Sequence, residues 1–568
     1  MKVSDFIAEY LARQGITYVF GVTGAHILWL IDSISRHPAL KFVPCAHEQG
    51  AAFAADAYSR FDGFGVALAT SGPGAVNLLS GACSAYFDFT PMLLLTGQVA
   101  TQQLGGRGMG IRQLGFQETP TVDIYRPVVK WAFQLLQPER VRLYLEFLLA
   151  TAKKFPQGPV LLDVPDDVQR AEVDPKALAG CHALAEKPER EVDTAEASQL
   201  MAKAERPILI LGAGARMPRA LLGKFVGEMG FPVLTTWGGK DLLPWDHPLN
   251  FGTFGTCGPR TGNFAIQCAD LVLSLGAKLG AQEVGQNQAL FAPQAKKIVV
   301  DADIRELGKL DGLDALRLPM RARAFLEAVS GGWRRKDYPA WRGKLEGWRE
   351  RYSVETEDWD VSPYRFIRAL SQEAPPGCVV VTDAGATLVW MMQSWRVKDK
   401  QRVMSAFNHS PMGWALPAAI GAAEASNRPV ICVTGDGSFL MNIQELATLS
   451  KLNLNVKVFV MDNLGYGIIR QTQDMWLEGR HFASSSEGGL GGIEVAKVAS
   501  SFGLQSCQIG SNKSLPLLPR ILAMPGPVVC QVSVDPRAKI LARMAKGKTL
   551  ADLWPELPPE TLGKELSW

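Results

Sequence analysis

A Gly-Asp-Gly motif at residues 435–437 is the part of this sequence best suited to bind a phosphate group. The apolar run Pro429 to Val433 predicts a buried strand that ends just before it. Apolar residues from Phe439 to Leu449 then recur at three- and four-residue steps, which predicts one helix. Glycines let backbone N–H groups approach phosphate oxygens, and a helix N-terminus adds partial positive charge. We therefore expect a diphosphate to bind at Gly435, Asp436, Gly437 and Ser438.

A second motif, Asp462-Asn463-Leu464-Gly465, follows the next apolar run, Val456 to Met461. Because 25 residues separate Gly437 from Asn463, one strand–helix–strand unit would bring both motifs to the same edge of a parallel sheet. The Asp436 carboxylate, the Asn463 amide and a backbone carbonyl form the hard oxygen set that Mg²⁺ prefers and shares with phosphate. A lone Gly-Asp-Gly indicates only a tight turn, so the spacing of the two motifs is what favours a metal-bridged diphosphate.

The composition excludes several classes of protein. The chain has 568 residues, 47% of them hydrophobic, and a formal net charge of +3, so neither nucleic acid nor an anionic membrane is indicated as a partner. Nine cysteines without a C-x-x-C pair argue against a disulfide framework and a zinc site. There is no apolar signal-peptide core and no apolar run near the roughly 20 residues of a membrane span. We expect a cytoplasmic protein.

The paired motifs resemble the diphosphate-binding signature of thiamine diphosphate enzymes. That signature usually ends in a double Asn, whereas the first of the two positions here is Asp462. The metal ligand is the second position, so the resemblance implies Asn463 as a ligand beside Asp436. It also implies that Gly465 supplies the carbonyl ligand.

Strand-like and helix-like segments alternate along the whole chain, which predicts three doubly wound α/β domains with parallel sheets. With the resemblance, these are an N-terminal pyrimidine-binding domain (1–175), a central FAD-type domain (190–335) and a C-terminal diphosphate- and Mg-binding domain (360–548), followed by a tail (549–568). We expect the first and third to share one architecture and the tail to lie across a surface. Ser4 is predicted to cap the first helix. The expected linkers are the charged run Glu186 to Glu191 and the Trp-containing, partly helical segment Gly331 to Pro363.

Glu48 lies between a predicted strand and a helix of small residues, in His47-Glu48-Gln49-Gly50-Ala51-Ala52. A glutamate there could simply stabilise the helix N-terminus. The segment also resembles the family's acid segment, whose carboxyl group hydrogen-bonds to N1′ of the cofactor pyrimidine and thereby promotes removal of the C2 proton. The resemblance therefore implies that Glu48 is the first catalytic residue.

Two further segments resemble the loops that hold the cofactor. In Ser410-Pro411-Met412-Gly413-Trp414, the Ser410 carbonyl stands where the family accepts a hydrogen bond from the aminopyrimidine, and Met412 where an apolar side chain keeps the cofactor bent. A single Met could equally be core filler. Gly385 and Thr387 lie in a second candidate phosphate turn after the strand Val379 to Thr382, although the family often has Gly-Gln-His there.

The branch of the family is indicated by Ser71-Gly72-Pro73-Gly74, by Phe116-Gln117-Glu118-Thr119-Pro120 and by the segment from Gly158 to Gln169, which resemble acetolactate synthases and their relatives. The resemblance implies that Gln117 and Phe116 face the C2 centre and position the donor ketoacid. It also implies an active site shared between subunits, hence a homodimer or homotetramer. FAD is common in the central domain of this branch, so Gly212 and Gly214 could hold its diphosphate and Asp301 its ribose; a lone Gly-x-Gly is weak evidence.

The acceptor side departs from acetolactate synthases. Their Arg-rich segment reads Gly276-Ala277-Lys278-Leu279-Gly280-Ala281-Gln282 here, and an acceptor-side Trp corresponds to Thr472. Losing an Arg fork and a large ring should make the pocket roomier and less selective for anions. We expect an enzyme that decarboxylates pyruvate and adds the acetyl unit to a neutral ketone or aldehyde, such as a keto sugar nucleotide. Alternatives are an acetolactate synthase of branched-chain amino acid biosynthesis, a pyruvate oxidase or 2-ketoacid decarboxylase, and a non-catalytic cofactor-binding protein.

Overall fold

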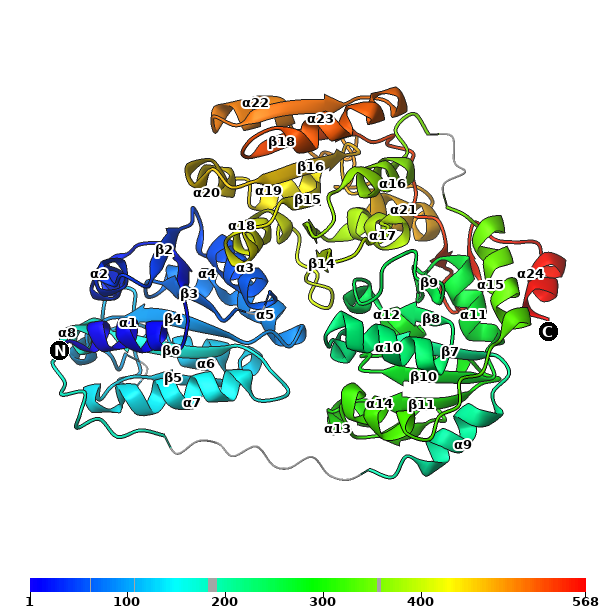
Figure 1. Ribbon diagram of the computed structural model, residues 1–568. Helices are drawn as coiled ribbons and strands as arrows, with labels where there is room; N and C mark the ends of the chain where they lie inside the picture. The colour runs from blue at the N-terminus through cyan, green and yellow to red at the C-terminus, as the bar shows by residue number, and fades with distance from the viewer. Residues whose placement is uncertain (62, 107, 182–191, 355–358, 568) are drawn as a thin grey trace.

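A computed structural model describes residues 1–568 except 62, 107, 182–191, 355–358 and 568 (Figure 1). The described residues form three six-stranded parallel sheets, each flanked by helices. The predicted fold class, three parallel α/β domains, is confirmed. The linker predicted at Glu186 to Glu191 lies outside the described residues.

The N-terminal sheet has the strand order β2-β1-β3-β4-β6-β5. Three of its inner strands, β3, β4 and β6, are wholly buried, as expected when helices cover both faces of a parallel sheet. The strands are β1 Tyr18–Gly21, β2 Lys41–Pro44, β3 Gly65–Ala69, β4 Met92–Gln98, β5 Trp131–Gln134 and β6 Val160–Pro165; the helices are α1 Val3–Arg13, α2 Leu28–Arg36, α3 Glu48–Ser59, α4 Pro73–Asn77, α5 Leu79–Phe87, α6 Thr121–Tyr125, α7 Val141–Lys153 and α8 Asp166–Arg170.

The C-terminal sheet has the order β14-β13-β15-β16-β18-β17, which is the order of the first sheet repeated. The two domains therefore have the same topology, as the sequence predicted. The strands are β13 Val379–Thr382, β14 Arg402–Met404, β15 Val430–Gly435, β16 Val456–Asp462, β17 Gln505–Ile509 and β18 Val528–Ser533; the helices are α16 Pro363–Glu373, α17 Gly385–Ser394, α18 Ala415–Ser426, α19 Asp436–Met441, α20 Glu445–Leu452, α21 Gly467–Trp476, α22 Val495–Ser501 and α23 Leu518–Ala523.

The central sheet has a different order, β12-β11-β10-β7-β8-β9. Numbered within the domain this is 6-5-4-1-2-3, the strand order of dinucleotide-binding folds. The strands are β7 Pro207–Leu211, β8 Val233–Thr235, β9 Asn250–Thr253, β10 Leu271–Leu275, β11 Lys296–Val300 and β12 Leu316–Leu318; the helices are α9 Ala195–Lys203, α10 Arg219–Met229, α11 Arg260–Cys268, α12 Ala281–Val284, α13 Ile304–Gly308 and α14 Ala322–Ser330.

The N- and C-terminal domains meet through α3 and α18, which lie side by side at the centre of Figure 1. Small residues allow the close approach: a Cβ at Gly421 would lie 2.0 Å from the Ala54 carbonyl oxygen. Phe53 and Ala57 of α3 belong to the same hydrophobic cluster as the apolar side chains of α18. One continuous core therefore spans both domains and fixes the orientation of α3.

Two local predictions were wrong. Helix α1 begins at Val3 because Lys2 and Val3 pair with Glu172 and Ala171, so Ser4 lies inside the helix, where it accepts a hydrogen bond from Ser33. The single helix predicted from Phe439 to Leu449 is two helices, α19 and α20. Asn442 separates them, with φ −135°.

The second linker and the tail both pack on the central domain. Helix α15 (Pro339–Arg351) buries Trp341 and Trp348 in the central core, so the predicted partly helical linker is confirmed. The antiparallel pair β19 (Arg543–Met544) and β20 (Leu553–Trp554) joins the predicted tail to the six residues before it, and helix α24 (Pro559–Leu566) follows; we call the whole segment from Arg543 onward the tail. Glu565 accepts hydrogen bonds from Trp348 and Tyr352, which fastens α24 to the linker.

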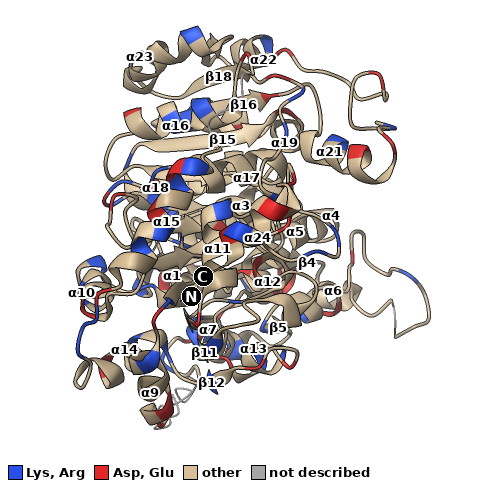
Figure 2. Cartoon of the chain, turned by 90° about the vertical axis from the view of Figure 1, so that its right-hand side faces the viewer, with Lys and Arg blue, Asp and Glu red and all other residues tan. Residues whose placement is uncertain are grey.

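None of the helices in the described part of the chain is both long and apolar enough to span a membrane. Charged residues of both signs are scattered over the side of the molecule shown in Figure 2.

Candidate active site

The predicted diphosphate turn lies at the carboxyl end of β15, where the chain enters α19. A Cβ at Gly437 would lie 2.2 Å from the ring of Tyr466, and a Cβ at Gly435 would lie 3.2 Å from Thr387 Oγ1. Glycine at 437 therefore lets this turn contact the loop after β16. Ser438 is buried beside it.

Asp436 is held by two backbone amides. Its Oδ1 accepts from the Gly437 N–H at 2.9 Å, and its Oδ2 from the Gly465 N–H at 2.7 Å. The residue is only 8% exposed, and this burial, with the nearby charge of Asp462, raises the pKa of Asp436 to about 6 despite the two amides. A bound cation would favour the ionised form, so the site fits the predicted metal role.

The other two predicted metal ligands follow the neighbouring strand, β16. Asn463 is buried, and Gly465 has φ +131°, where a Cβ would lie 2.4 Å from the Ser484 carbonyl oxygen. Arg470 donates to the carbonyls of Asn463 at 2.7 Å and Leu464 at 3.2 Å, which fixes the loop.

The loops of β15 and β16 thus bring Asp436, Asn463 and Gly465 together. Their oxygens form the donor set that suits Mg²⁺. The described residues contain no cluster of three or more His, Cys, Asp and Glu side chains that could hold a metal. The expected set has a single carboxylate, so its assignment to Mg²⁺ stays a prediction.

Asp383 connects the candidate Mg²⁺ site to the second phosphate turn and to the loop that carries Ser410 and Met412. Its carboxylate is buried and accepts from the N–H groups of Ala384 (2.9 Å), Gly413 (3.0 Å) and Ala415 (3.0 Å), and from Thr434 Oγ1 (3.3 Å). Burial raises the pKa of Asp383, although these hydrogen bonds oppose the shift. Asp383 therefore holds three segments in one geometry.

The second turn places Gly385 at the first position of α17, with φ +74°, and buries Thr387 beside Gly435. An N-terminal helix turn next to the Gly-Asp-Gly turn suits a diphosphate.

The loop that carries Ser410 and Met412 is sharply bent. Ser410 has φ +52°, and its N–H donates to the Ala406 carbonyl at 2.8 Å. Gly413 has φ +83°, and its carbonyl accepts from the Asn442 amide at 2.9 Å. Asp88 of the N-terminal domain accepts from the N–H groups of Phe407 and Asn408, both at 3.0 Å.

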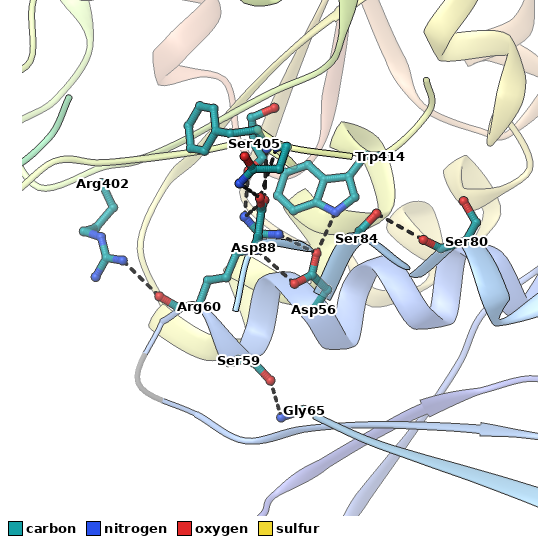
Figure 3. Close-up of polar contacts among 12 residues, drawn as sticks. Asp56, Ser59, Arg60, Gly65, Ser80, Ser84, Asp88, Arg402, Ser405 and Trp414 are labelled. Atoms are coloured by element: carbon teal, nitrogen blue, oxygen red, sulfur yellow. Dashed lines mark hydrogen bonds and ion pairs between the residues drawn. The ribbon is translucent and has the colours of Figure 1, made fainter. Parts of the chain in front are cut away.

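Arg60 connects Asp88 to other residues at the interface between the N- and C-terminal domains (Figure 3). Its guanidinium pairs with Asp56 and Asp88, each at 2.9 Å, and donates to the Ser405 carbonyl at 2.7 Å. Trp414 Nε1 donates to Asp56 at 2.9 Å. Burial would lower the pKa of Arg60, but Asp56 and Asp88 raise it above its ordinary value, so it stays charged.

The central domain is attached to the same network through Asp241. This buried carboxylate pairs with Arg216 at 2.6 Å and with Arg402 at 3.0 Å. Arg402 in turn donates to the Arg60 carbonyl at 2.9 Å. All three domains therefore contribute to the position of the loop that follows β14.

Glu48 is the first residue of α3. Its Oε2 accepts from the Asn77 side-chain amide at 3.0 Å, and a Cβ at Gly74 would lie 3.1 Å from its Oε1. The preceding residues are held by the buried Glu445, which accepts from the N–H groups of Ala46 (3.3 Å) and His47 (3.0 Å).

Gln49, the residue after Glu48, links the acid segment to the C-terminal domain of the same chain. Asn442 donates to Gln49 at 3.1 Å and to the Gly413 carbonyl on the pyrimidine loop. This hydrogen-bonding explains why the helix predicted through residue 442 is interrupted there.

Gln117 and Phe116 belong to the long connection between β4 and α6, which projects at the right of Figure 2. Gln117 has φ +69° and packs on Gly72, 3.0 Å from a Cβ built there. The turn Ser71 to Gly74 therefore has Gln117 on one side and Glu48 on the other. Phe116 is 80% exposed.

A cavity of about 790 Å³ opens between the central and C-terminal domains. Gly385 and Ser410 line it on the cofactor side, and the segment from Lys278 to Gln286 and the tail residues Arg543 to Gly547 line it on the other. Neither Glu48 nor Gln117 is among the described residues that line this cavity.

The geometry gives the flavin prediction no support at Gly212 and Gly214. The Gly212 N–H donates to the Leu275 carbonyl and the Gly214 N–H to the Gly276 carbonyl, so neither is available to a diphosphate in this arrangement. These glycines let two loops touch, because a Cβ at Gly212 would lie 2.2 Å from the Gly276 carbonyl oxygen. Burial raises the pKa of Asp301 to about 6.

Several residues of the site were not predicted from the sequence. Asp383 is the first residue of the predicted second phosphate turn but was not named as a site residue, although its position directly after a strand was a usable signal. Asp88, Asn77 and Asn442 act through contacts between distant segments, and Arg543 comes from the tail; nothing in their local sequence marks them.

Comparison with known proteins agrees with this geometry. The profiles of the N-terminal thiamine pyrophosphate (TPP)-binding domain, the central domain and the C-terminal TPP-binding domain of thiamine pyrophosphate enzymes match residues 1–124, 194–329 and 383–532. The acetolactate synthase isozyme 1 large subunit of Escherichia coli (strain K12) is 31% identical over 563 residues, 96% of each chain. Acetolactate synthase 1 of Zea mays is 30% identical over 97% of this chain and 88% of its own. The acetolactate synthase large subunit of Porphyra purpurea is 31% identical, with 96% and 94% covered.

The chain therefore belongs to the thiamine pyrophosphate enzymes, in their acetolactate synthase-like branch. It is a decarboxylating carboligase that depends on thiamine diphosphate.

Proposed function

We propose that this carboligase takes a two-carbon unit from pyruvate and adds it to the carbonyl carbon of a second 2-ketoacid. The end-to-end similarity to acetolactate synthases, at 31% identity over 96% of the chain, is the observation that carries the proposal. The assembled Asp436, Asn463 and Gly465 loops support it. With pyruvate in both roles, two pyruvate ions and one proton give one acetolactate ion and one carbon dioxide.

The reaction breaks the C1–C2 bond of the donor and leaves its electron pair on C2. That pair forms the new bond to C2 of the acceptor, and the acceptor carbonyl oxygen takes up the proton. Thiamine diphosphate, when bound, supplies the electron sink that makes this cleavage accessible.

Asp436, Asn463 and the Gly465 carbonyl would hold Mg²⁺ in this proposal. The turns at Gly435 to Ser438 and Gly385 to Thr387 would bind the diphosphate through backbone N–H groups. Asp383 keeps the two turns in register through its bonds to Ala384 and Thr434.

The pyrimidine end would be held by Glu48, Ser410 and Met412. The Glu48 carboxyl group would hydrogen-bond to the ring nitrogen, with Asn77 fixing its orientation at 3.0 Å. The Ser410 carbonyl would accept from the amino group, and the Met412 side chain would hold the two rings apart. Gln117 and Phe116 would position the donor.

A homodimer or homotetramer would complete each site in this proposal. The cavity in one chain has Gly385 and Ser410 on its wall but lacks Glu48 and Gln117. Large apolar side chains are exposed on the loop that carries Gln117 and on the segment from Leu464 to Phe482, which includes α21; this is unusual for a free surface. They include Met109, Phe116, Leu464, Trp476 and Phe482.

The keto sugar alternative rests on the segment 276–282, which lacks the arginines expected there from the resemblance, and on the size of the cavity. The relatives favour a 2-ketoacid acceptor instead. Binding of FAD to the central domain is a separate proposal, which rests on the family resemblance. Visible flavin absorbance of the purified protein would test it.

Product mass tests the proposed function. Pyruvate alone, with thiamine diphosphate and Mg²⁺, should give carbon dioxide and acetolactate as the main product. Little acetolactate, but ready coupling to keto sugars or aldehydes, would refute the 2-ketoacid acceptor. Free acetaldehyde or oxygen uptake would identify a decarboxylase or an oxidase.

A further inference from the structure

The tail brings a guanidinium group to the wall of the cavity. Arg543 lies in β19, and the adjacent backbone is pinned on both sides. The Leu541 N–H donates to the Tyr364 hydroxyl at 2.7 Å, the Leu541 carbonyl accepts from Gln393 at 2.7 Å, and the Met544 N–H donates to the Thr256 carbonyl at 2.7 Å. The position of Arg543 is therefore set by both neighbouring domains.

Only part of this guanidinium has a partner. Nη2 donates to Thr472 Oγ1 at 2.9 Å, whereas Nη1 is buried and has no hydrogen-bond partner among the described residues. A buried, unpaired N–H of a charged group is unfavourable. Because Arg543 also lines the cavity, a small turn of its side chain would let a carboxylate bound there pair with the guanidinium. By the resemblance, Thr472 takes the place of the acceptor-side Trp, so its partner Arg543 would lie on the acceptor side of the site.

The charges that surround the cavity also favour an anion. Lys278 and Lys546 line it with Arg543, their ammonium groups lying over the rings of Phe89 (5.7 Å) and Trp476 (5.3 Å). Glu283 is the one acidic side chain among the lining residues that the structure describes. It accepts from the Gly280 N–H at 2.9 Å, and burial raises its pKa, so three cationic side chains face one acidic side chain in the lining.

We propose that Arg543 binds the carboxylate of the acceptor 2-ketoacid and so sets the preference for an anionic acceptor. This inference rests on the proposed function. It reverses the expectation of a neutral acceptor drawn from residues 276–282, because the guanidinium missing there is supplied by a different segment. The Arg fork can present two parallel N–H groups to a carboxylate, which a Lys cannot do.

Competing acceptors test the assignment. Pyruvate is the donor, and 2-ketobutyrate competes with propanal, which is the same chain without the carboxylate. The two coupling products, 2-aceto-2-hydroxybutyrate and 3-hydroxypentan-2-one, are separated by mass. Arg543→Met should lower the ketobutyrate-to-propanal preference by roughly 10- to 100-fold, the range for one lost charged hydrogen bond, through a higher KM for ketobutyrate. The loss should fall on ketobutyrate rather than on propanal, which has no carboxylate for Arg543 to bind.

Lys548→Met is the matched control, because it removes one positive charge five residues further along the same segment, at an exposed position outside the cavity lining, and its preference should match the wild type. Arg543→Lys keeps the charge without the fork, should lie between, and carries the test if the Met variant does not fold. Carbon dioxide release with an unchanged product ratio in both Arg543 variants would overturn the assignment and leave the proposed function standing. No carbon dioxide from pyruvate in the wild type would refute the proposed function and this assignment with it.

Discussion

Replacing Asp88 should loosen the loop that carries Ser410 and Met412, although Asp88 lies in another domain. The Asp88 side chain is 5% exposed, and it accepts from the backbone N–H groups of Phe407 and Asn408 while pairing with Arg60. Asp88→Ala removes the partner of both amides at once.

The size of the effect follows from those contacts. Each hydrogen bond to a charged group contributes about 1.5–3 kcal/mol, and losing one partner of a buried pair costs about 3–5 kcal/mol, with the terms not additive. We expect about 2–4 kcal/mol of local stability to be lost, which corresponds to roughly 30- to 1000-fold faster amide exchange where exchange occurs by local opening. Asp88→Asn keeps one acceptor oxygen and should lose less.

Hydrogen exchange of the segment 402–412 measures this change directly, and titration of thiamine diphosphate measures its consequence. Binding requires the closed loop, so the affinity for the cofactor should fall by the same factor as the fraction of molecules in which the loop is closed. Glu327→Gln, which breaks an exposed pair with Arg323, should change neither quantity. Unchanged exchange together with unchanged affinity in Asp88→Ala would show that Asp88 does not hold the loop.

Three other outcomes follow from the site. Glu48→Gln should bind the cofactor yet lose most turnover, because the amide is a far weaker acid; wild-type rates would refute its role. Mg²⁺-dependent cofactor binding should weaken as the pH falls below about 6, by up to tenfold per pH unit, because protonation of Asp436 competes with the cation; a pH-independent titration would exclude Asp436 as a ligand. Gly437→Ala should weaken cofactor binding, since its Cβ would lie 2.2 Å from the Tyr466 ring, and unchanged binding would show that the turn can shift; Gly223→Ala, where a Cβ has open space, is the control.

The sequence predicted the features that arise within one strand–helix–strand unit. The apolar runs before Gly435 and Asn463 were enough to place both motifs at one sheet edge, because parallel strands all end on the same side. The helix period from Phe439 to Leu449 was misleading because it runs through Asn442, whose side chain bonds to another domain. No local pattern encodes that competition.

Contacts between distant segments were the part that the sequence could not supply. Local similarity points to residues 276–282 for an acceptor-side guanidinium, whereas Arg543, which we propose for that role, lies in a C-terminal segment without periodic signal. The glycines at 212 and 214 resemble a nucleotide motif, yet their requirement comes from the neighbouring Gly276 backbone. Identical spacings can thus serve either a ligand or the packing of two loops.

The contact of α3 with α18 has a consequence for how the enzyme can move. Phe53 and Ala57 lie in the same apolar interior as Leu416 and Ile420, and Gly421 rests against the backbone of Ala54. Hinge bending at this seam would expose a shared interior and open voids that water cannot fill favourably. We therefore expect the conformational change that admits a substrate to occur in the surface loops or in the central domain. The N- and C-terminal domains should move together as one rigid unit.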